Sequence, residues 1–191
     1  MPILKMNDME LPYTINRGTW MFNNIDFSKR GLRTLRRIFP EDQKIIVTEN
    51  FWCQDNYLQS LEGLPEGFSV VGDFCCYNNI LKSLEGLPKT FIVNGGFYCS
   101  NNRLLSLRGL PDNFKVSGNF WCDKNNIPTL RDLPIGFSVG GCFDCSNNNI
   151  TTIDVPYGFH VAGNVYCHGN NIKSLAGFSN SFWLNRNARK L

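Results

Sequence analysis

The chain repeats itself at a fixed interval of 23 residues. Five phenylalanines mark this period: Phe51, Phe74, Phe97, Phe120 and Phe143. Val165 follows them in the same column. A cysteine stands two residues after each member of the column: Cys53, Cys76, Cys99, Cys122, Cys145 and Cys167. Such a period is typical of a solenoid, in which each repeat buries its apolar side only by stacking on its neighbours. The sequence therefore predicts one elongated domain of stacked repeats.

Each repeat has further fixed positions when the leading phenylalanine is numbered zero. Asparagine stands at position five, as in Asn102, and Leu or Ile stands at positions seven and ten, as in Leu104 and Leu107. The third repeat then continues with Leu110-Pro111, Phe114, Val116 and Gly118. Apolar or small residues alternate with others from the second phenylalanine to the cysteine, which indicates extended chain with one buried face. This alternation fits either one long strand or two short strands that meet at the glycine.

The asparagine and proline columns predict the rest of the repeat. The asparagine side chain can bond to turn backbone groups of its own repeat and the next, so the column would form a hydrogen-bonded ladder. The Leu-Pro pair disfavours a regular helix because proline restricts the residue before it. We expect an irregular, 3₁₀ or polyproline-like outer side with few or no long helices. The cysteine column is expected to consist of buried thiols that pack as compact hydrophobes.

The string F-x-C-x-x-N-x-L-x-S-L-x-G-L-P-x-x-F resembles the leucine-rich repeat, with Phe and Cys where that family usually has Leu. The resemblance covers residues 51 to about 180 and is greatest to repeat proteins of tailed bacteriophages and some bacteria. It implies a leucine-rich-repeat solenoid, a right-handed superhelix with a parallel β-sheet on its concave side. Such a curved stack is used to hold other proteins.

The remaining segments fit capping of a single structural domain. We expect an N-terminal cap at 1–27, a degenerate first repeat at 28–50, regular repeats of 22–23 residues at 51–180, and a C-terminal cap with a basic tail at 181–191. Caps are needed because a bare terminal repeat exposes an unpaired strand edge.

Charge is distributed unevenly along the chain. Residues 1–50 carry eight basic and six acidic groups, residues 51–180 eight and ten, and residues 181–191 three and none. The repeats thus lack the basic stripe of a nucleic-acid-binding face. The first 20 residues lack the features of a signal peptide, and no apolar run reaches membrane-spanning length. We therefore expect a cytoplasmic protein, in the host cytoplasm if it is viral, with free thiols and no membrane contact.

Three patterns that suggest chemistry have simpler interpretations. Cys142 and Cys145 are three residues apart on a strand and so point to opposite faces, which makes joint metal ligation improbable. Asp123, Ser146 and His168 share position three of successive repeats, but a catalytic triad needs the histidine between the other two. Every glycine is explained by the repeat rather than by a phosphate-binding loop. We expect a protein that is not an enzyme and has no metal or cofactor.

The outward-facing position one carries the functional signal. Four of its six residues are large aromatics, the aromatic strip: Trp52, Tyr98, Trp121 and Tyr166. Trp and Tyr dominate interface hot spots, so we expect the strip to bind a protein partner. The alternative is that the rings only shield one another and the sheet. The expected partner-binding residues are Trp52, Tyr77, Tyr98, Trp121, Asp123, Asp144, Tyr166 and His168, flanked by Asp73 and Asn119.

A basic cluster lies outside the regular repeats, at Arg30, Arg33, Arg36 and Arg37. Solvated decoration of the capping repeat is the first interpretation, and a second contact with an acidic partner surface is the next. The leading functional hypothesis is a bacteriophage protein that inhibits or redirects a host defence or gene-expression protein. Self-association as a structural or assembly protein is the first alternative, and single-stranded nucleic-acid binding, by stacking on aromatic rings, is the second.

Overall fold

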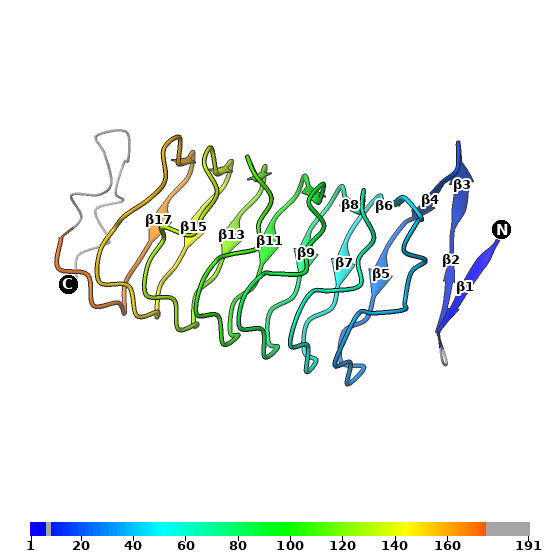
Figure 1. Ribbon diagram of the computed structural model, residues 1–191, viewed down its shortest axis with the longest axis horizontal. Helices are drawn as coiled ribbons and strands as arrows, with labels where there is room; N and C mark the ends of the chain where they lie inside the picture. Colours follow the sequence, from blue (N-terminus) through cyan, green and yellow to red (C-terminus); the bar gives the residue numbers. More distant parts are fainter. Residues whose placement is uncertain (7–8, 175–191) are drawn as a thin grey trace.

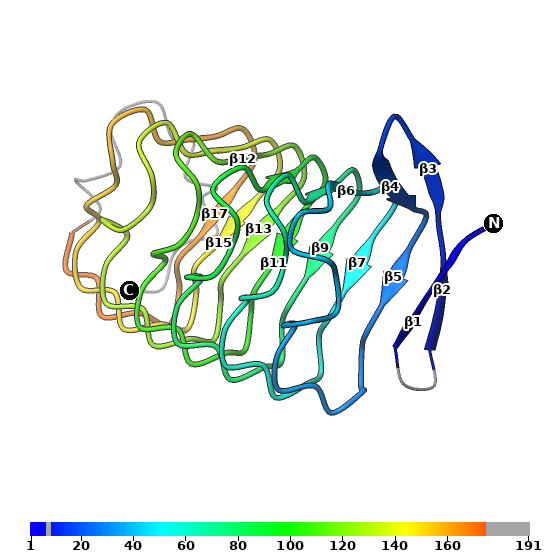
Figure 2. The ribbon, with the colours of Figure 1, turned by 45° about the vertical axis from the view of Figure 1, so that its right-hand side comes forward.

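The computed structural model describes residues 1–6 and 9–174, which form a parallel β-solenoid whose repeats follow one another along the longest axis of the molecule (Figure 1). Each repeat contributes two short strands, one to each of two faces of the solenoid (Figure 2). Within the described ranges no residue is helical, and the outer side consists of turns and bends. Those ranges likewise contain no helix able to cross a membrane.

A seven-stranded parallel sheet forms the first face, and every repeat adds one strand to it in order. Its strands are β5 (Ile25–Asp26), β7 (Phe51–Trp52), β9 (Phe74–Cys75), β11 (Phe97–Tyr98), β13 (Phe120–Trp121), β15 (Phe143–Asp144) and β17 (Val165–Tyr166). Residues of the same column pair with each other, as Phe97 does with Phe74 and Phe120. The 23-residue period therefore predicted the register correctly.

The second face is built mainly from the short strands that carry a recurring valine, such as Val70, Val93 and Val116. One part is a five-stranded sheet of β3 (Thr14–Asn16), β4 (Thr19–Phe22), β6 (Ile45–Val47), β8 (Ser69–Val70) and β10 (Ile92–Val93). The other part is a three-stranded parallel sheet of β12 (Lys115–Val116), β14 (Ser138–Val139) and β16 (His160–Val161). Two short strands per repeat thus replace the single long strand that the alternation also allowed.

The glycine column lies at the corner between the two strands of a repeat. Gly95 donates its N–H to the carbonyl of Gly72 in the preceding repeat at 3.0 Å, and Gly118 donates to Gly95 at the same distance. A Cβ at Gly95 would lie 2.4 Å from the Gly72 carbonyl oxygen. Glycine is required here because the corners of neighbouring repeats approach too closely for a side chain.

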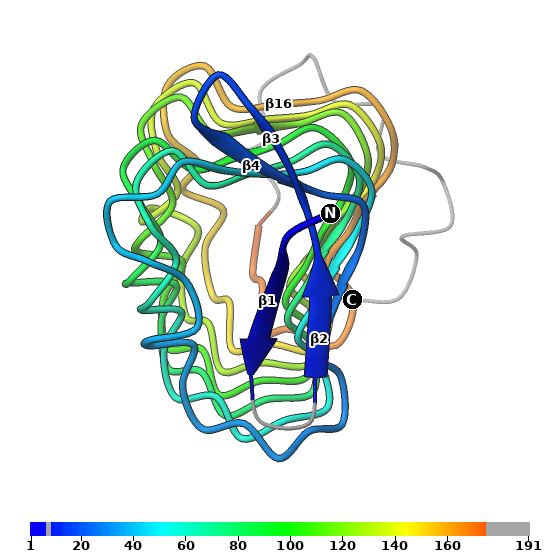
Figure 3. The same cartoon turned by 90° about the vertical axis from the view of Figure 1, so that its right-hand side faces the viewer.

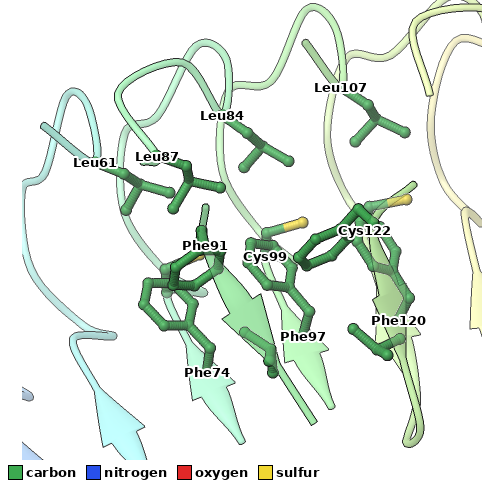
Figure 4. Packing of buried hydrophobic residues seen from close by; sticks show 14 of the residues in the cluster. Leu61, Phe74, Leu84, Leu87, Phe91, Phe97, Cys99, Leu107, Phe120 and Cys122 are labelled. Carbon is green, nitrogen blue, oxygen red and sulfur yellow. The ribbon is translucent and has the colours of Figure 1, made fainter. Parts of the chain in front are cut away.

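The core consists of two interlocking phenylalanine columns. Phe97 stacks on Phe74 and on Phe120 with ring centroids 5.3 Å apart in both cases. It meets Phe114 of the second column edge-on, at 5.7 Å and 86°. Leucines of the outer side close the interior from the opposite wall (Figure 4). Offset and edge-to-face contacts are the preferred arrangements of aromatic rings, so the two phenylalanine columns can fill the interior of the solenoid.

The buried polar columns fit the interpretation of the sequence. The Asn102 amide donates to the carbonyls of Cys76 at 3.0 Å and Cys99 at 3.1 Å, and its oxygen accepts the N–H of Leu81 at 3.0 Å. Asn79 and Asn125 make the equivalent bonds in their repeats. The predicted asparagine ladder is therefore confirmed, with its bonds between repeats running to the preceding repeat rather than to the next. Five of the six column cysteines are buried, and Cys167 is half-buried.

The parallel stack begins within the segment 1–27 that the sequence suggested as a cap. Strands β4 and β5 already pair in parallel with β6 and β7. Only β1 (Ile3–Met6), β2 (Met9–Pro12) and β3 precede the stack, and the β1–β2 hairpin lies across its N-terminal opening (Figure 3). Met9 and Leu11 of this hairpin are buried against the core. The expected C-terminal cap at 181–191 lies outside the described residues.

Candidate functional site

An open depression of about 470 Å³ lies on the outward side of the seven-stranded sheet, over β9, β11 and β13. Seven residues from three successive repeats line this aromatic pocket: Asp73, Cys75, Tyr77, Tyr98, Ser100, Trp121 and Asp123. Because β11 pairs in register with both neighbouring strands, side chains of the same column are brought together. The volume falls within the range of ligand-binding pockets, roughly 300–1,000 Å³.

Two aromatic rings form the wall of the pocket. Tyr98 and Trp121 pair across β11 and β13, with ring centroids 5.0 Å apart and an interplanar angle of 72°. Trp121 is 41% exposed, whereas Tyr98 is half-buried. The Tyr98 ring lies back over Gly96, where an added Cβ would lie 2.5 Å from the phenolic oxygen. Gly96 therefore leaves the space that this ring occupies.

The pocket also contains a covered thiol. Cys75 pairs with Tyr98 in the neighbouring strand, and only 7% of the residue is exposed. Burial, aided by the nearby Asp73 carboxylate, raises the pKa of Cys75 to about 12. The thiol is therefore protonated at neutral pH and contributes an uncharged surface to the pocket.

Two carboxylates line the pocket as well. One oxygen of Asp73 accepts the Gly96 N–H at 2.6 Å, and Asp123 accepts a hydrogen bond from the Ser100 hydroxyl. Burial, followed by the charge of Asp73, raises the pKa of the Tyr98 phenol. The negative charge of Asp73 therefore acts on the Tyr98 ring in the wall of the pocket.

Four of the eight predicted binding residues line the pocket: Tyr77, Tyr98, Trp121 and Asp123. The other four lie on the same sheet or in the turns that follow it, outside the lining. Trp52 of β7 is half-buried and pairs with Cys75 of β9. Tyr166 and His168 are exposed at the far end of the sheet. The aromatic strip is thus interrupted at Cys75 and Asp144, and its centre is the Tyr98–Trp121 pair.

Asp144 closes its own turn. One oxygen of its carboxylate accepts both the N–H and the hydroxyl of Ser146, at 2.9 and 2.6 Å. Asp26 makes the same two bonds with Ser28 at the equivalent position of an earlier repeat. The Ser146 hydroxyl therefore donates to Asp144 rather than to His168. Within residues 1–6 and 9–174, no three metal-ligating side chains gather into one group.

The basic cluster follows β5 and contributes nothing to the pocket lining. All four arginine residues are exposed. The guanidinium of Arg36 pairs with Glu62, and the Arg30 N–H donates to the Asn56 side chain at 3.0 Å. This arrangement fits decoration of the first repeat.

Sequence reasoning missed Gly96 and the roles of Cys75 and Ser100 in the pocket. The sequence does single out Gly96, in the column of residues that directly precede the leading residue of each repeat. Residues at that position in the other repeats carry a side chain: Asn24, Asn50, Asp73, Asn119, Cys142 and Asn164. The only glycine in this column stands two residues before Tyr98.

A comparison with protein-family models found no match, and neither did a comparison with curated proteins.

Proposed function

We propose that this chain is a non-enzymatic binding module that holds a protein partner on its aromatic pocket. The observation that supports this most directly is the Tyr98–Trp121 pair, in which Trp121 is 41% exposed beside a depression of about 470 Å³. An exposed tryptophan packed on a tyrosine beside a cavity is typical of interface hot spots, because such rings bury a large area at low entropic cost.

The backbone under the pocket favours binding without rearrangement. Cys76 donates its N–H to the Tyr98 carbonyl at 2.9 Å, and Cys99 donates its N–H to the Trp121 carbonyl at 2.8 Å. The three repeats that carry the lining are therefore held in register by sheet hydrogen bonds. A preformed surface loses little conformational entropy on binding, which supports a mechanism of steric occlusion of the partner.

The resemblance of the repeats to leucine-rich repeats of tailed bacteriophages and bacteria supports a host protein as that partner. In this proposal the module blocks or redirects the host protein by covering its surface.

Affinity capture from bacterial lysate tests the proposal. The wild type is compared with the double variant Tyr98→Ala/Trp121→Ala, and circular dichroism and thermal unfolding establish that both are folded. Tyr157→Ala is the matched control, since Tyr157 is 89% exposed and lies outside the pocket lining. We expect a protein that wild type and Tyr157→Ala retain and the double variant loses. Equal retention by all three would contradict the proposal.

Self-association is a second candidate because β3 is an exposed terminal strand. Among the residues that the structure describes, it pairs only with β4 at the end of the five-stranded sheet, and Ile15 within it is 58% exposed. An uncovered strand of this kind can pair with a second copy. Sedimentation velocity over a range of concentrations would reveal a dimer, and Ile15→Lys should abolish it.

A further inference from the structure

The negative charge at Asp73 is not needed for the stack. In the column before the strand, a side-chain oxygen accepts an N–H from the next repeat. The oxygen of Asn50 accepts the N–H of Asp73 at 2.8 Å, and that of Asn119 accepts the N–H of Cys142 at 2.8 Å. Asp73 does the same for Gly96 at 2.6 Å. Because an asparagine amide performs this structural task in other repeats, the carboxylate of Asp73 adds a charge that the fold does not require.

Asp123 is a second carboxylate without an equivalent in its column. The other residues at position three of the repeats are Ser28, Gln54, Tyr77, Ser100, Ser146 and His168. Asp123 accepts a hydrogen bond from Ser100, a bond that an amide oxygen can also accept. Asp73 and Asp123 are thus the acidic residues of columns that carry other residue types in the remaining repeats, and both line the aromatic pocket.

The pocket as a whole favours a positive charge. Its lining contains two carboxylates and three aromatic rings, and none of the seven residues is basic. Four ion pairs within the described residues involve carboxylates outside the pocket, at Glu10, Glu62, Asp132 and Asp154. The faces of Trp and Tyr rings attract cations through their quadrupole, in the same direction as the carboxylates.

We propose that the aromatic pocket accepts a basic side chain, arginine or lysine, presented by the protein partner. Its charged group lies beside Asp73 and Asp123, and its aliphatic stem packs on Tyr98 and Trp121. This inference rests on the proposed function and adds the chemistry that the partner must present. Charge complementarity selects such a partner surface over an acidic one, since an anionic group would face both carboxylates.

Nuclear magnetic resonance with short peptides tests the inference directly. The probes are acetyl-Gly-Arg-Gly-amide, acetyl-Gly-Lys-Gly-amide and acetyl-Gly-citrulline-Gly-amide, of which the last has the shape of the arginine peptide without its charge. The signal is the indole N–H of Trp121, assigned with Trp121→Phe. We expect saturable shifts with the basic peptides at millimolar concentration, and binding of the citrulline peptide weaker by about tenfold or more. Equal binding of the citrulline peptide, or no shift at tens of millimolar arginine peptide, would overturn the inference.

The matched variants are Asp73→Asn/Asp123→Asn and Asp42→Asn/Asp112→Asn. Both pairs change net charge equally, but Asp42 and Asp112 are exposed and lie outside the pocket lining. The pocket pair should weaken binding of the arginine peptide by about tenfold, and the control pair should leave it within about twofold. Equal binding to both variants would contradict the role of the two carboxylates.

The lysate capture separates this inference from the proposed function. A partner that is lost with Tyr98→Ala/Trp121→Ala but retained by Asp73→Asn/Asp123→Asn would uphold the protein-binding function and overturn the basic side chain. If the basic peptides bind but no captured protein depends on Tyr98 and Trp121, the proposal of a protein partner would be overturned. The preference of the pocket for a cation would still be supported.

Discussion

Gly96 and Tyr98 are complementary in shape: the glycine leaves open the space into which the tyrosine ring folds back. A Cβ at Gly96 would lie 2.5 Å from the phenolic oxygen of Tyr98 and 2.6 Å from the ring carbon that carries it. The adjacent Gly95 has a different neighbour, because a Cβ there would lie 2.4 Å from the carbonyl oxygen of Gly72. Two consecutive glycines thus serve different purposes, one for the site and the other for the stack.

Replacing Gly96 with alanine should alter the pocket and leave the fold intact. The clash is with a side chain that can rotate, so we expect a loss of stability of about 1 kcal/mol or less together with displacement of the Tyr98 ring. Binding of the partner or of the arginine peptide should fall by about tenfold. Urea unfolding and the peptide titration measure the two effects on the same sample.

The matched variant is Gly95→Ala, for which we expect the opposite result. Its clash is with backbone that is fixed by a hydrogen bond between repeats, so stability should fall by about 3 kcal/mol. If Gly96→Ala destabilised the protein as much as Gly95→Ala, the assignment of Gly96 to the site would be wrong.

Neighbouring asparagines provide a test of the ladder. Asn125 donates to the carbonyls of Cys99 and Cys122, both at 3.1 Å, and accepts the N–H of Leu104 at 3.0 Å. Asn125→Ala would leave these buried groups unpaired, so the free energy of unfolding should fall by about 3 kcal/mol. Asn126→Ala is the control, since Asn126 is exposed, and it should cost about 0.5 kcal/mol or less. Similar losses for the two variants would contradict the ladder as a major source of stability.

Much of the fold follows from the columns of the sequence because a solenoid repeats one set of contacts. The period predicted the strand register, and the polar residue at position five predicted the ladder. The start of the stack was harder to predict. The strand β5 begins with Ile25 rather than phenylalanine, and Arg30 stands where other repeats have asparagine. Asn56 nevertheless accepts the N–H of Leu32 at 2.9 Å and donates to the Phe27 carbonyl at 2.7 Å, the bonds by which the other ladder asparagines hold the preceding repeat, so this segment stacks as the regular repeats do.

The candidate site was predicted only in part because its shape depends on which way side chains turn. Alternation placed Tyr98 and Trp121 on the outward face, but it also placed Cys75 there, and Cys75 is almost entirely covered. Column position cannot tell that the Tyr98 ring lies over Gly96 or that Asp144 closes its own turn through Ser146. These outcomes are decided by neighbours in adjacent repeats and by short-range hydrogen bonds.

The buried thiol column should make the protein sensitive to alkali. Burial raises the pKa of five thiols well above 9.0, those of Cys53, Cys76, Cys99, Cys122 and Cys145. In the unfolded chain these thiols ionise near pH 9, whereas in the folded protein they remain protonated. Above that pH the unfolded state binds fewer protons, so stability is complete below about pH 9 and falls as pH rises toward the folded pKa values.

Each such thiol should contribute about 1.4 kcal/mol of lost stability per pH unit above about pH 9. Urea unfolding at pH 8, 9 and 10 measures this slope. Cys122→Ala removes one buried thiol, and its slope should be shallower by the equivalent of one proton even though its stability at pH 8 is also lower. Tyr98 and Tyr77, whose pKa values are also raised by burial, change the slope in both proteins alike. If wild type and Cys122→Ala lost stability with the same slope, the thiol column would not be the source of the alkaline sensitivity.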